Sequence, residues 1–325
     1  MPASRRIALA IGDPNGIGPE IAVKAAIAPG VAPPLLVGDW RVVARYAEKL
    51  APGHRLREAD GAAPAVEGVI DVFNVEALRE SDFAPGRVAP EAGVATVAYV
   101  KAAIGLATAG HVAAVVACPH NETAVNAAGI RFTGYPELVA EILGLPEGRV
   151  FMMFVGGGLR VVHATLHEQL SGALARLTPE LVEAAAVAAV EALRRLGVEK
   201  PRVGLFGINP HAGEGGLFGD DDFRVTVPAA ALLRAKGIDV AGPVGADLLI
   251  GEKDFDAFVA MYHDQGHIPV KLLAGRAASA LSIGAGVLFS TVGHGSAHDI
   301  AGRMTADPEA VLRTLALLAG ARQSV

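Results

Sequence analysis

The sequence predicts an α/β fold, because short β-rich apolar runs alternate with longer stretches rich in alanine and leucine. Several apolar runs are continuous rather than alternating, as expected of strands that are covered on both faces. Glycine, proline, histidine, aspartate or asparagine follows the ends of these runs. Because open α/β sheets bind ligands beyond the carboxyl ends of their strands, most of the candidate chemistry lies where a site is expected.

The alternation assigns the elements in order along the chain. The expected strands are 7–11, 34–37, 113–117, 150–155, 203–206, 257–261 and 287–290. The expected helices are 18–28, 93–109, 123–128, 136–143, 178–196, 227–236 and 308–319. No internal repeat, low-complexity tract or obvious linker interrupts this order.

Composition limits the class of protein. The 325 residues suffice for two packed lobes, and 52% hydrophobic with 19% charged residues favours a sizeable core over disorder. The net charge of −6, without a basic block, argues against nucleic acid or an anionic membrane as a partner. No apolar stretch is long enough for a membrane span, and the N-terminal segment is interpreted as the first strand rather than a signal peptide.

The single cysteine, Cys118, excludes a disulfide framework, which fits a reducing cytoplasm. Because it ends an apolar run, it is interpreted as a buried side chain rather than a nucleophile.

Most of the ten histidines lie in four short segments, HATLH (163–167), NPH (209–211), YHDQGH (262–267) and GHGS (293–296). Imidazoles drawn from separate loops, with open coordination positions left over, suit Zn²⁺ or another late divalent ion. His163 and His167 are expected on one extended stretch, where residues of equal parity share a face. Asp264 is placed to fix the tautomer of a ligating His263. The alternative for each histidine is a hydrogen-bonded structural role.

Two further segments carry candidate chemistry. Lys271, eight positions after His263 in an apolar setting, is expected to act as an acid/base group or to anchor a carboxylate; the alternative is a surface lysine at a strand edge. The loop 293–302 is bounded by glycines, which allow close approach to a nucleotide; the alternative is an ordinary helix-capping turn. The turn GDPNGIGPE after the first strand lacks the G-x-G-x-x-G pattern.

The motifs GDPNGIGPEI, NPHAGEGG, MYHDQGHIPVK and HGSAHDIAG, in this order, resemble the 4-hydroxythreonine-4-phosphate dehydrogenase family of vitamin B6 synthesis. The last motif also resembles the adenosine-binding loop of the isocitrate and isopropylmalate dehydrogenases. The resemblance implies a homodimer with a two-lobed α/β/α fold of that type and NAD in the cleft between the lobes. The expected lobes are 1–125 with 285–325, which holds the cofactor loop, and 126–284, which holds the metal ligands and the dimer interface.

The resemblance also implies roles for individual residues. A divalent metal, with Zn favoured over Fe, Mn, Co or Mg, is expected on three histidines, one of them given across the dimer interface: His167, His211 and His263. The expected catalytic residues are Asp247, Asp264 and Lys271. The expected cofactor-binding residues are His294, Gly295, Ser296 and Asp299.

The chain departs from the biosynthetic family at the substrate end. Tyr135 and Pro136 replace a His-Thr pair, Ala280 replaces Asn, Phe289 replaces Arg and Gly293 replaces Asp, while the segment 118–122 replaces Pro-x-x-Lys. Losing an arginine removes a bidentate phosphate partner, so a phosphorylated substrate is expected to bind poorly.

The substituted segments resemble the terephthalate cis-dihydrodiol dehydrogenase branch, which implies NAD-dependent oxidation and decarboxylation of a carboxylic acid diol. Tyr135, Pro136, Lys271 and Phe289 are then the expected substrate-binding residues, with Arg131 and Arg276 as candidates for the second carboxylate. The alternatives are the biosynthetic 4-hydroxythreonine-4-phosphate dehydrogenase, a dehydrogenase of sugar-acid phosphates and a noncatalytic ligand-binding relative.

Overall fold

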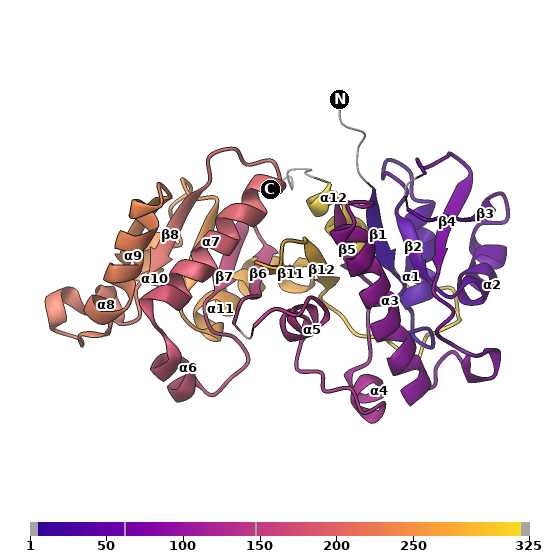
Figure 1. Ribbon diagram of the computed structural model, residues 1–325, viewed down its shortest axis with the longest axis horizontal. Helices are drawn as coiled ribbons and strands as arrows, with labels where there is room; N and C mark the ends of the chain where they lie inside the picture. Colours follow the sequence, from indigo (N-terminus) through magenta and orange to yellow (C-terminus); the bar gives the residue numbers. More distant parts are fainter. Residues whose placement is uncertain (1–5, 62, 147, 320–325) are drawn as a thin grey trace. The chain divides into compact units, whose positions relative to one another are not determined.

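The computed structural model describes residues 6–61, 63–146 and 148–319, apart from the side chain of Arg276. The described residues form two compact units: one comprises 6–132 together with 286–319, and the other comprises Thr133–Ala285. Each unit has its own part of the β-structure and its own helices (Figure 1).

The β-structure of the first unit is entirely parallel. Its strands run in the order β3-β4-β2-β1-β5-β12. They are β1 (Ile7–Ala10), β2 (Leu35–Gly38), β3 (Arg55–Glu58), β4 (Val69–Asn74), β5 (Ala114–Ala117) and β12 (Phe289–Val292). The central strands β2 and β5 are buried along their whole length, which explains their continuous apolar sequence.

Helices cover this parallel sheet. They are α1 (Gly18–Ala26), α2 (Trp40–Leu50), α3 (Pro90–Thr108), α4 (Glu122–Ala127) and α12 (Glu309–Leu318), with a 3₁₀ turn η1 (Glu80–Asp82). The long helix α3 begins with a proline in its first turn and packs against β1, β2 and β5. Helix α1 packs against both α2 and α12.

The second unit has mixed β-structure in the order β11-β6-β7-β10-β8-β9. The strands are β6 (Phe151–Gly156), β7 (Leu159–His163), β8 (Arg202–Phe206), β9 (Asp239–Val244), β10 (Ala257–Ala260) and β11 (Ser279–Ile283). The pairs β11/β6 and β6/β7 are antiparallel, whereas β7/β10, β10/β8 and β8/β9 are parallel. The carboxyl ends of β7, β10 and β8 therefore lie at one edge of the sheet.

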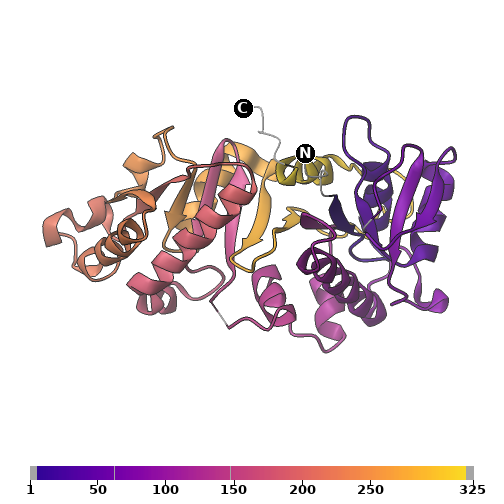
Figure 2. The same cartoon turned by 45° about the horizontal axis from the view of Figure 1, so that its top comes forward.

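The helical elements of this unit are α5 (Tyr135–Ile142), α6 (Leu170–Arg176), α7 (Pro179–Arg195), η2 (Pro210–Gly216), α8 (Asp221–Arg224), α9 (Thr226–Ala235), α10 (Ala246–Leu249), α11 (His263–Ala274) and η3 (Gly275–Ala277). Helix α7 lies across the sheet (Figures 1 and 2), and the hydroxyl of Thr178 accepts a hydrogen bond from the backbone N–H of Leu181 at its start. Helix α11 packs against β6, β7 and β10, with Val270 buried among Val161, Phe154 and Phe258.

The predicted α/β class is confirmed, whereas one expected strand and the strand-edge alternative given for Lys271 are wrong. The strand that was expected to hold both His163 and His167 ends at His163, so the two imidazoles do not share a strand face. Lys271 lies on helix α11 and not at a strand edge, because the segment after β10 folds as a helix despite Pro269.

Candidate functional site

Four histidines meet at the carboxyl edge of the second unit's sheet. His163 ends β7, His167 lies in the loop that follows, and His263 and His267 occupy the first turns of α11. Because β7 and β10 are parallel neighbours, with His163 opposite Ala260, their following segments emerge side by side. The ring centroids of His167 and His263 are 5.4 Å apart, those of His263 and His267 are 3.8 Å apart, and those of His163 and His267 are 4.6 Å apart.

His263 is held in one tautomer by its neighbour. Its Nδ1 lies 2.6 Å from Oδ1 of Asp264, a distance at which the imidazole N–H donates to the carboxylate. The Nε2 atom therefore keeps its lone pair, which is the form that binds a metal ion. Asp264 is itself exposed in the first turn of α11, where the helix dipole favours negative charge.

His163 and His267 form a second hydrogen-bonded pair behind these residues. Nδ1 of His267 lies 3.0 Å from Nε2 of His163, and Nδ1 of His163 lies 3.3 Å from the carbonyl oxygen of Met152 on β6. Burial and, to a lesser extent, the charge of His267 lower the pKa of His163 to about 3. Burial also lowers the pKa of His267 to about 4, together with the charges of His263, His167 and Lys271. Both imidazoles are therefore neutral at pH 7.

A glycine permits this arrangement. A Cβ atom on Gly266 would lie 2.5 Å from Nε2 of His163 and 2.7 Å from Cγ1 of Val161. Helix α11 can thus approach β7 closely only because position 266 has no side chain. Gln265 fastens the same turn, since its side chain accepts from the N–H of Met261 and donates to the carbonyl of Gly207, each at 2.7 Å.

A cavity of about 270 Å³ opens beside His167 and His263. Its lining combines these imidazoles with two carboxylates and with apolar side chains: Leu166, His167, Glu168, Leu170, Ala173, Tyr262, His263 and Asp264. The cavity can therefore hold a small molecule with both polar and apolar parts.

His211 lies apart from this pair within the chain. It is exposed on η2, where His211, Ala212 and Glu214 adopt positive φ angles of 52°, 53° and 42°. Its Nδ1 lies 2.9 Å from the carboxylate of Glu214. Across residues 6–61, 63–146 and 148–319, no three His, Cys, Asp or Glu side chains are placed to hold one metal ion.

Asp247 lies near His211. Gly245 lies close to both residues. A Cβ atom at position 245 would lie 2.8 Å from the Asp247 carboxylate and 3.5 Å from Cα of His211. Asp222, which the sequence interpretation did not include, fixes the start of the same loop: its buried carboxylate accepts the N–H groups of Ile208 and Asn209 at 2.8 and 3.0 Å. The run of aspartates at 220–222 was the only signal in the sequence.

Lys271 follows His263 and His267 at helical spacing, and its ammonium group lies 5.5 Å from the centroid of the Phe154 ring. Its exposed side chain is thus on the same face of α11 as the two histidines. The expected substrate residues Tyr135 and Pro136 are buried in the first turn of α5.

In the first unit, the loop 293–302 packs on the turn after β1. The N–H of Ile17 donates to the carbonyl of Ser296 at 2.9 Å, and a Cβ on Gly16 would lie 2.7 Å from Cβ of Ser296. Nε2 of His298 lies 2.9 Å from the buried carboxylate of Asp13. Burial raises the pKa of Asp13, although its backbone hydrogen bond with Asn15 and the charge of His298 oppose the shift.

A second acidic residue holds the far end of this loop. The buried carboxylate of Glu20 accepts the N–H groups of Met304 and Ala306 at 3.2 and 2.7 Å, and it pairs with Lys24 at 2.8 Å. The interpretation of the sequence gave no site role to Asp13, Glu20 or His298, although all three lie within its quoted motifs. Of the expected cofactor residues, Ser296 is buried, His294 is half-buried, and Gly295 and Asp299 are exposed.

The other expected residues of the first unit are at the surface or in its core. Phe289 is fully buried in β12, opposite Val115 of β5. Arg131 is exposed, and the side chain of Arg276, in the second unit, lies outside the described residues. Cys118 is buried, and burial raises the pKa of its thiol, which favours the structural interpretation over a nucleophile.

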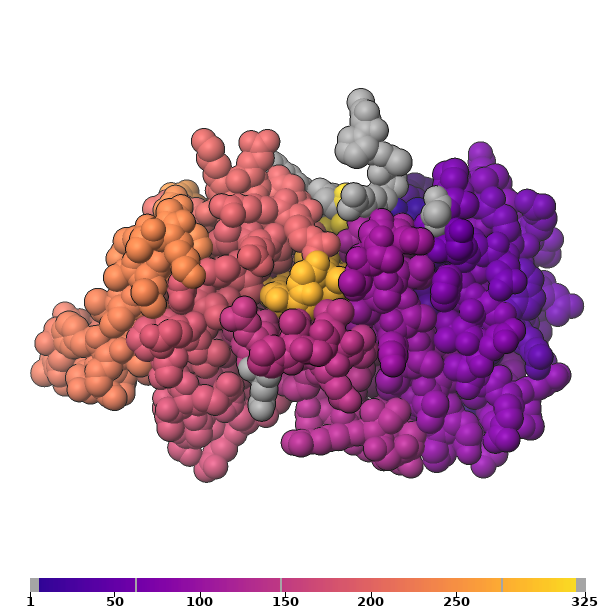
Figure 3. Space-filling view, viewed as in Figure 1, coloured from indigo at the N-terminus to yellow at the C-terminus, as the bar shows by residue number. Residues whose placement is uncertain are grey.

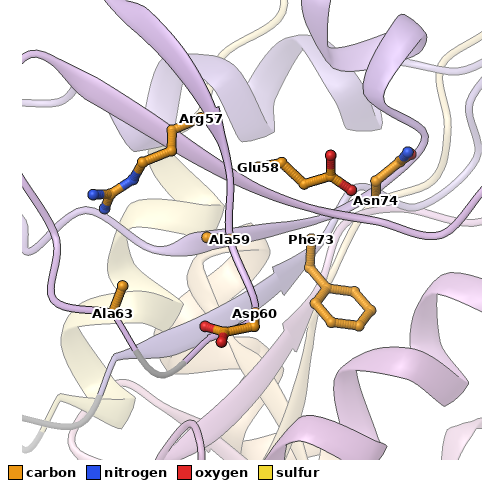
Figure 4. A pocket seen from close by; sticks show the side chains of 7 residues that line it. All are labelled: Arg57, Glu58, Ala59, Asp60, Ala63, Phe73 and Asn74. Atoms are coloured by element: carbon orange, nitrogen blue, oxygen red, sulfur yellow. The ribbon is translucent and has the colours of Figure 1, made fainter.

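A separate cavity of about 540 Å³ lies at the ends of β3 and β4 (Figure 4). Its lining is Arg57, Glu58, Ala59, Asp60, Ala63, Phe73 and Asn74. The guanidinium of Arg57 is already bound to the carboxylate of Asp71, at 2.6 and 2.9 Å. The remaining charged groups of this lining are carboxylates, so the cavity does not resemble the histidine-rich site.

Comparisons with known proteins agree with this fold. A family model described as pyridoxal phosphate biosynthetic protein PdxA matches residues 30–318. The 1,2-dihydroxy-3,5-cyclohexadiene-1,4-dicarboxylate dehydrogenase of Comamonas sp is 50% identical over 315 residues, which are 97% of each chain.

Two solved structures extend the comparison. A terephthalate 1,2-cis-dihydrodiol dehydrogenase from Burkholderia xenovorans is 56% identical, with a TM-score of 0.81 over 97% of this chain and 98% of that one. A 4-hydroxythreonine-4-phosphate dehydrogenase from Burkholderia phymatum is 36% identical, with a TM-score of 0.88 over 98% of both chains.

The α/β fold and these relatives define the class of protein as a dehydrogenase. Within that class, the chain belongs to the PdxA family, as its motifs predicted. None of the described helices is long and apolar enough to cross a membrane.

Proposed function

We propose that this protein oxidises and decarboxylates terephthalate cis-dihydrodiol, 1,2-dihydroxy-3,5-cyclohexadiene-1,4-dicarboxylate, to 3,4-dihydroxybenzoate. The observation that carries the proposal is the 50% identity, over 97% of both chains, to a dehydrogenase named for this substrate. Phe289 supports it, because a buried phenylalanine cannot give a phosphate the bidentate contact of an arginine.

The reaction conserves atoms and charge with NAD⁺ as its only co-reactant. Hydride leaves C2 of the diol for NAD⁺ as the C2 hydroxyl loses its proton, which gives a ketone β to the C1 carboxylate. The C1 carboxylate then leaves as CO₂, and its bonding electrons form the ring enolate. Protonation of the enolate oxygen completes the aromatic product.

The histidine donors fit a divalent metal ion. His167 and His263 are adjacent, and the hydrogen bond between His263 and Asp264 directs a lone pair away from the carboxylate. We propose that His167, His211 and His263 hold the ion, for which imidazole donors favour Zn²⁺ over Fe, Mn, Co or Mg. Bound there, the ion would supply Lewis-acid chemistry for an alcohol oxygen and the ketone derived from it.

The chain's own residues supply orientation and charge. Asp264 fixes the tautomer of His263, and the exposed ammonium of Lys271 on the same helix would bind a carboxylate of the substrate or transfer a proton. Asp247 would act beside His211. We propose Tyr135, Pro136 and Phe289 as substrate-binding residues and His294, Gly295, Ser296 and Asp299 as NAD-binding residues.

We infer that the protein is a homodimer and that His211 reaches the metal of the second copy. Two observations support this: no complete ligand set forms among the described residues of one chain, and the segment after His211 exposes the large apolar residues Leu217, Phe218 and Phe223. Figure 3 shows the neighbourhood of α8 on an outer face of the second unit. An exposed apolar surface beside a candidate metal ligand that lies apart from the other candidate ligands fits an interface between two copies of the chain.

The turnover of defined substrates tests the proposed function. The purified protein, supplied with NAD⁺ and Zn²⁺, is expected to form NADH and 3,4-dihydroxybenzoate from the diol and to leave 4-hydroxythreonine 4-phosphate and D-threonate 4-phosphate almost unchanged. Efficient oxidation of a phosphorylated substrate without turnover of the diol contradicts the proposal. The His211→Ala variant should lose oxidation and still bind NAD, which a fluorescence titration with NADH measures.

A further inference from the structure

The pair formed by His163 and His267 has no part in the proposed ligand set, yet its hydrogen bonds fix where its protons lie. The carbonyl oxygen of Met152 can only accept, so His163 carries its proton on Nδ1 and offers the lone pair of Nε2. His267 must therefore donate from Nδ1 to that lone pair, at 3.0 Å. In a neutral imidazole the second nitrogen is then unprotonated, so Nε2 of His267 is an acceptor.

The surroundings of His267 leave only this acceptor edge open. The ring of His263 stacks on the His267 ring with centroids 3.8 Å apart and an interplanar angle of 14°. The ring of Phe154 also stacks on it, with centroids 4.5 Å apart and an interplanar angle of 19°. Two nearly parallel rings at these distances cover opposite faces, and His163 covers the Nδ1 edge. The side chain is nevertheless only half-buried, so its accessible part is the edge that carries Nε2.

We propose that Nε2 of His267 accepts a hydrogen bond from the substrate hydroxyl that is not oxidised, and thereby selects a vicinal diol. The proposal rests on the proposed function. The two oxygens of a vicinal diol are in van der Waals contact with each other. Their short separation matches the rings of His263 and His267, which are nearly parallel with centroids 3.8 Å apart. In this arrangement His263 is the proposed metal ligand and His267 is the hydrogen-bond acceptor. An anionic oxygen at this position would face a lone pair, whereas a hydroxyl can donate to it.

Two product analogues isolate this hydrogen bond. 3,4-Dihydroxybenzoate carries both oxygens, and 3-hydroxybenzoate lacks only the one that derives from the hydroxyl that is not oxidised. With the Zn-loaded enzyme and NAD⁺, calorimetry should show that wild type binds the dihydroxy acid with a dissociation constant about tenfold lower than that of 3-hydroxybenzoate. This factor corresponds to the net free energy of one hydrogen bond. In His267→Leu the ratio of the two dissociation constants should fall to about one, while 3-hydroxybenzoate binds as in wild type.

Further variants separate this role from a general effect on the fold. His163→Leu, which frees the tautomer of His267, should lower the ratio as well, and His54→Leu, an exposed histidine of the first unit, should leave it at the wild-type value. A preference that persists in His267→Leu would show that the catechol oxygens chelate the metal, and it would overturn the inference. Because turnover of the diol is measured separately in wild type, this result is distinct from failure of the proposed function.

A measurement on the unchanged protein covers the case in which His267→Leu does not fold. With ¹⁵N-labelled histidine, the His267 ring should show a protonated Nδ1 and an unprotonated Nε2. The Nε2 signal should move on addition of 3,4-dihydroxybenzoate and stay in place with 3-hydroxybenzoate. A proton on Nε2, or equal shifts with both ligands, would refute the inference.

Discussion

His263 and Asp264 are consecutive residues whose side chains touch, although neighbours in a helix normally point in different directions. The contact forms because both residues lie in the first turn of α11, where the carboxylate also meets the positive end of the helix dipole. One aspartate thus stabilises the start of the helix and fixes the tautomer of a candidate ligand. The sequence predicted this role of Asp264 because the two residue types are adjacent.

The sequence identified His267 as a candidate histidine, but it did not predict the hydrogen bond between His267 and His163. Its partner His163 is 104 positions away, and only the parallel pairing of β7 with β10 places the two rings together. A separation of that size gives no signal in spacing or periodicity, so the hydrogen bond had to come from the structure.

Asp71 lies in a buried ion pair that stabilises the first unit. Its buried carboxylate binds Arg6 at 2.6 Å and Arg57 at 2.6 and 2.9 Å. Burial opposes its ionisation, but the hydrogen bonds and charges of the two arginines outweigh burial and hold the pKa of Asp71 below its usual value. Asp71→Asn should lower the free energy of unfolding by roughly 3 kcal/mol at pH 7, because it breaks a buried ion pair.

The pH dependence of this difference follows from the lowered pKa. A carboxylate with a depressed pKa in the folded state stabilises the protein above its unfolded pKa of about 3.9, and this contribution is lost as the pH falls through the folded pKa. Urea denaturation of Asp71→Asn and wild type should therefore show a gap that is full at pH 7 and shrinks below about pH 4. A gap that does not change with pH would mean that packing alone accounts for the loss.

At the scale of elements, the strongly patterned segments were predicted well. The buried strands β1, β2, β5 and β10 and the helices α3 and α7 lie close to their expected positions, because continuous apolar runs and long helical periods are strong local signals. Helix α2 was missed although its apolar residues have a helical period, and the edge strand β3 was missed because its sequence, RLRE, is polar.

Helix α11 was missed for a different reason. Its sequence HDQGHIPVKLLA contains a glycine and a proline, both of which disfavour a helix interior. Packing of Val270 into the core and the two hydrogen bonds of Gln265 outweigh that local preference. His263, His267 and Lys271 could therefore be named from the sequence, but their placement on one helix face could not.

The close contact between α11 and β7 depends on Gly266. The Cβ of Gly266→Ala would lie 2.5 Å from Nε2 of His163 and 2.7 Å from Val161, so α11 must move away from β7. We expect a loss of about 1–3 kcal/mol in the free energy of unfolding, typical of overpacking, and at least a tenfold weaker affinity for Zn²⁺ measured by chelator competition.

The matched control for this substitution is Gly105→Ala in α3, where a Cβ would meet nothing within 4 Å. It should stabilise the protein by about 0.5–1 kcal/mol, because alanine is the better helix former, and leave the affinity for Zn²⁺ unchanged. Equal effects of the two substitutions would contradict a close contact between α11 and β7.

At the scale of the whole molecule, similarity of fold and similarity of sequence rank the relatives differently. The 36% identical 4-hydroxythreonine-4-phosphate dehydrogenase has a TM-score of 0.88, above the 0.81 of the 56% identical dihydrodiol dehydrogenase. The fold is therefore common to both activities and does not choose between their substrates. That choice falls to side chains such as Phe289 and Tyr135, which the sequence alone already marked as departures.

The proposed sharing of the metal between two copies can be tested by mixing inactive variants. His211→Ala and His263→Ala should each lose activity as pure dimers. If His211 of one copy completes the metal site formed by His167 and His263 of the other copy, a mixed dimer retains one complete site. That site consists of His167 and His263 from the first variant and His211 from the second. Unfolding and refolding an equimolar mixture should then restore roughly one quarter of the wild-type rate, since half of the dimers are mixed and one of their two sites is complete.

The mixture of His167→Ala with His263→Ala should stay inactive, because every site then lacks one of the two adjacent ligands. If the first mixture also stays inactive after refolding, while refolded wild type recovers its rate, His211 does not act across the interface.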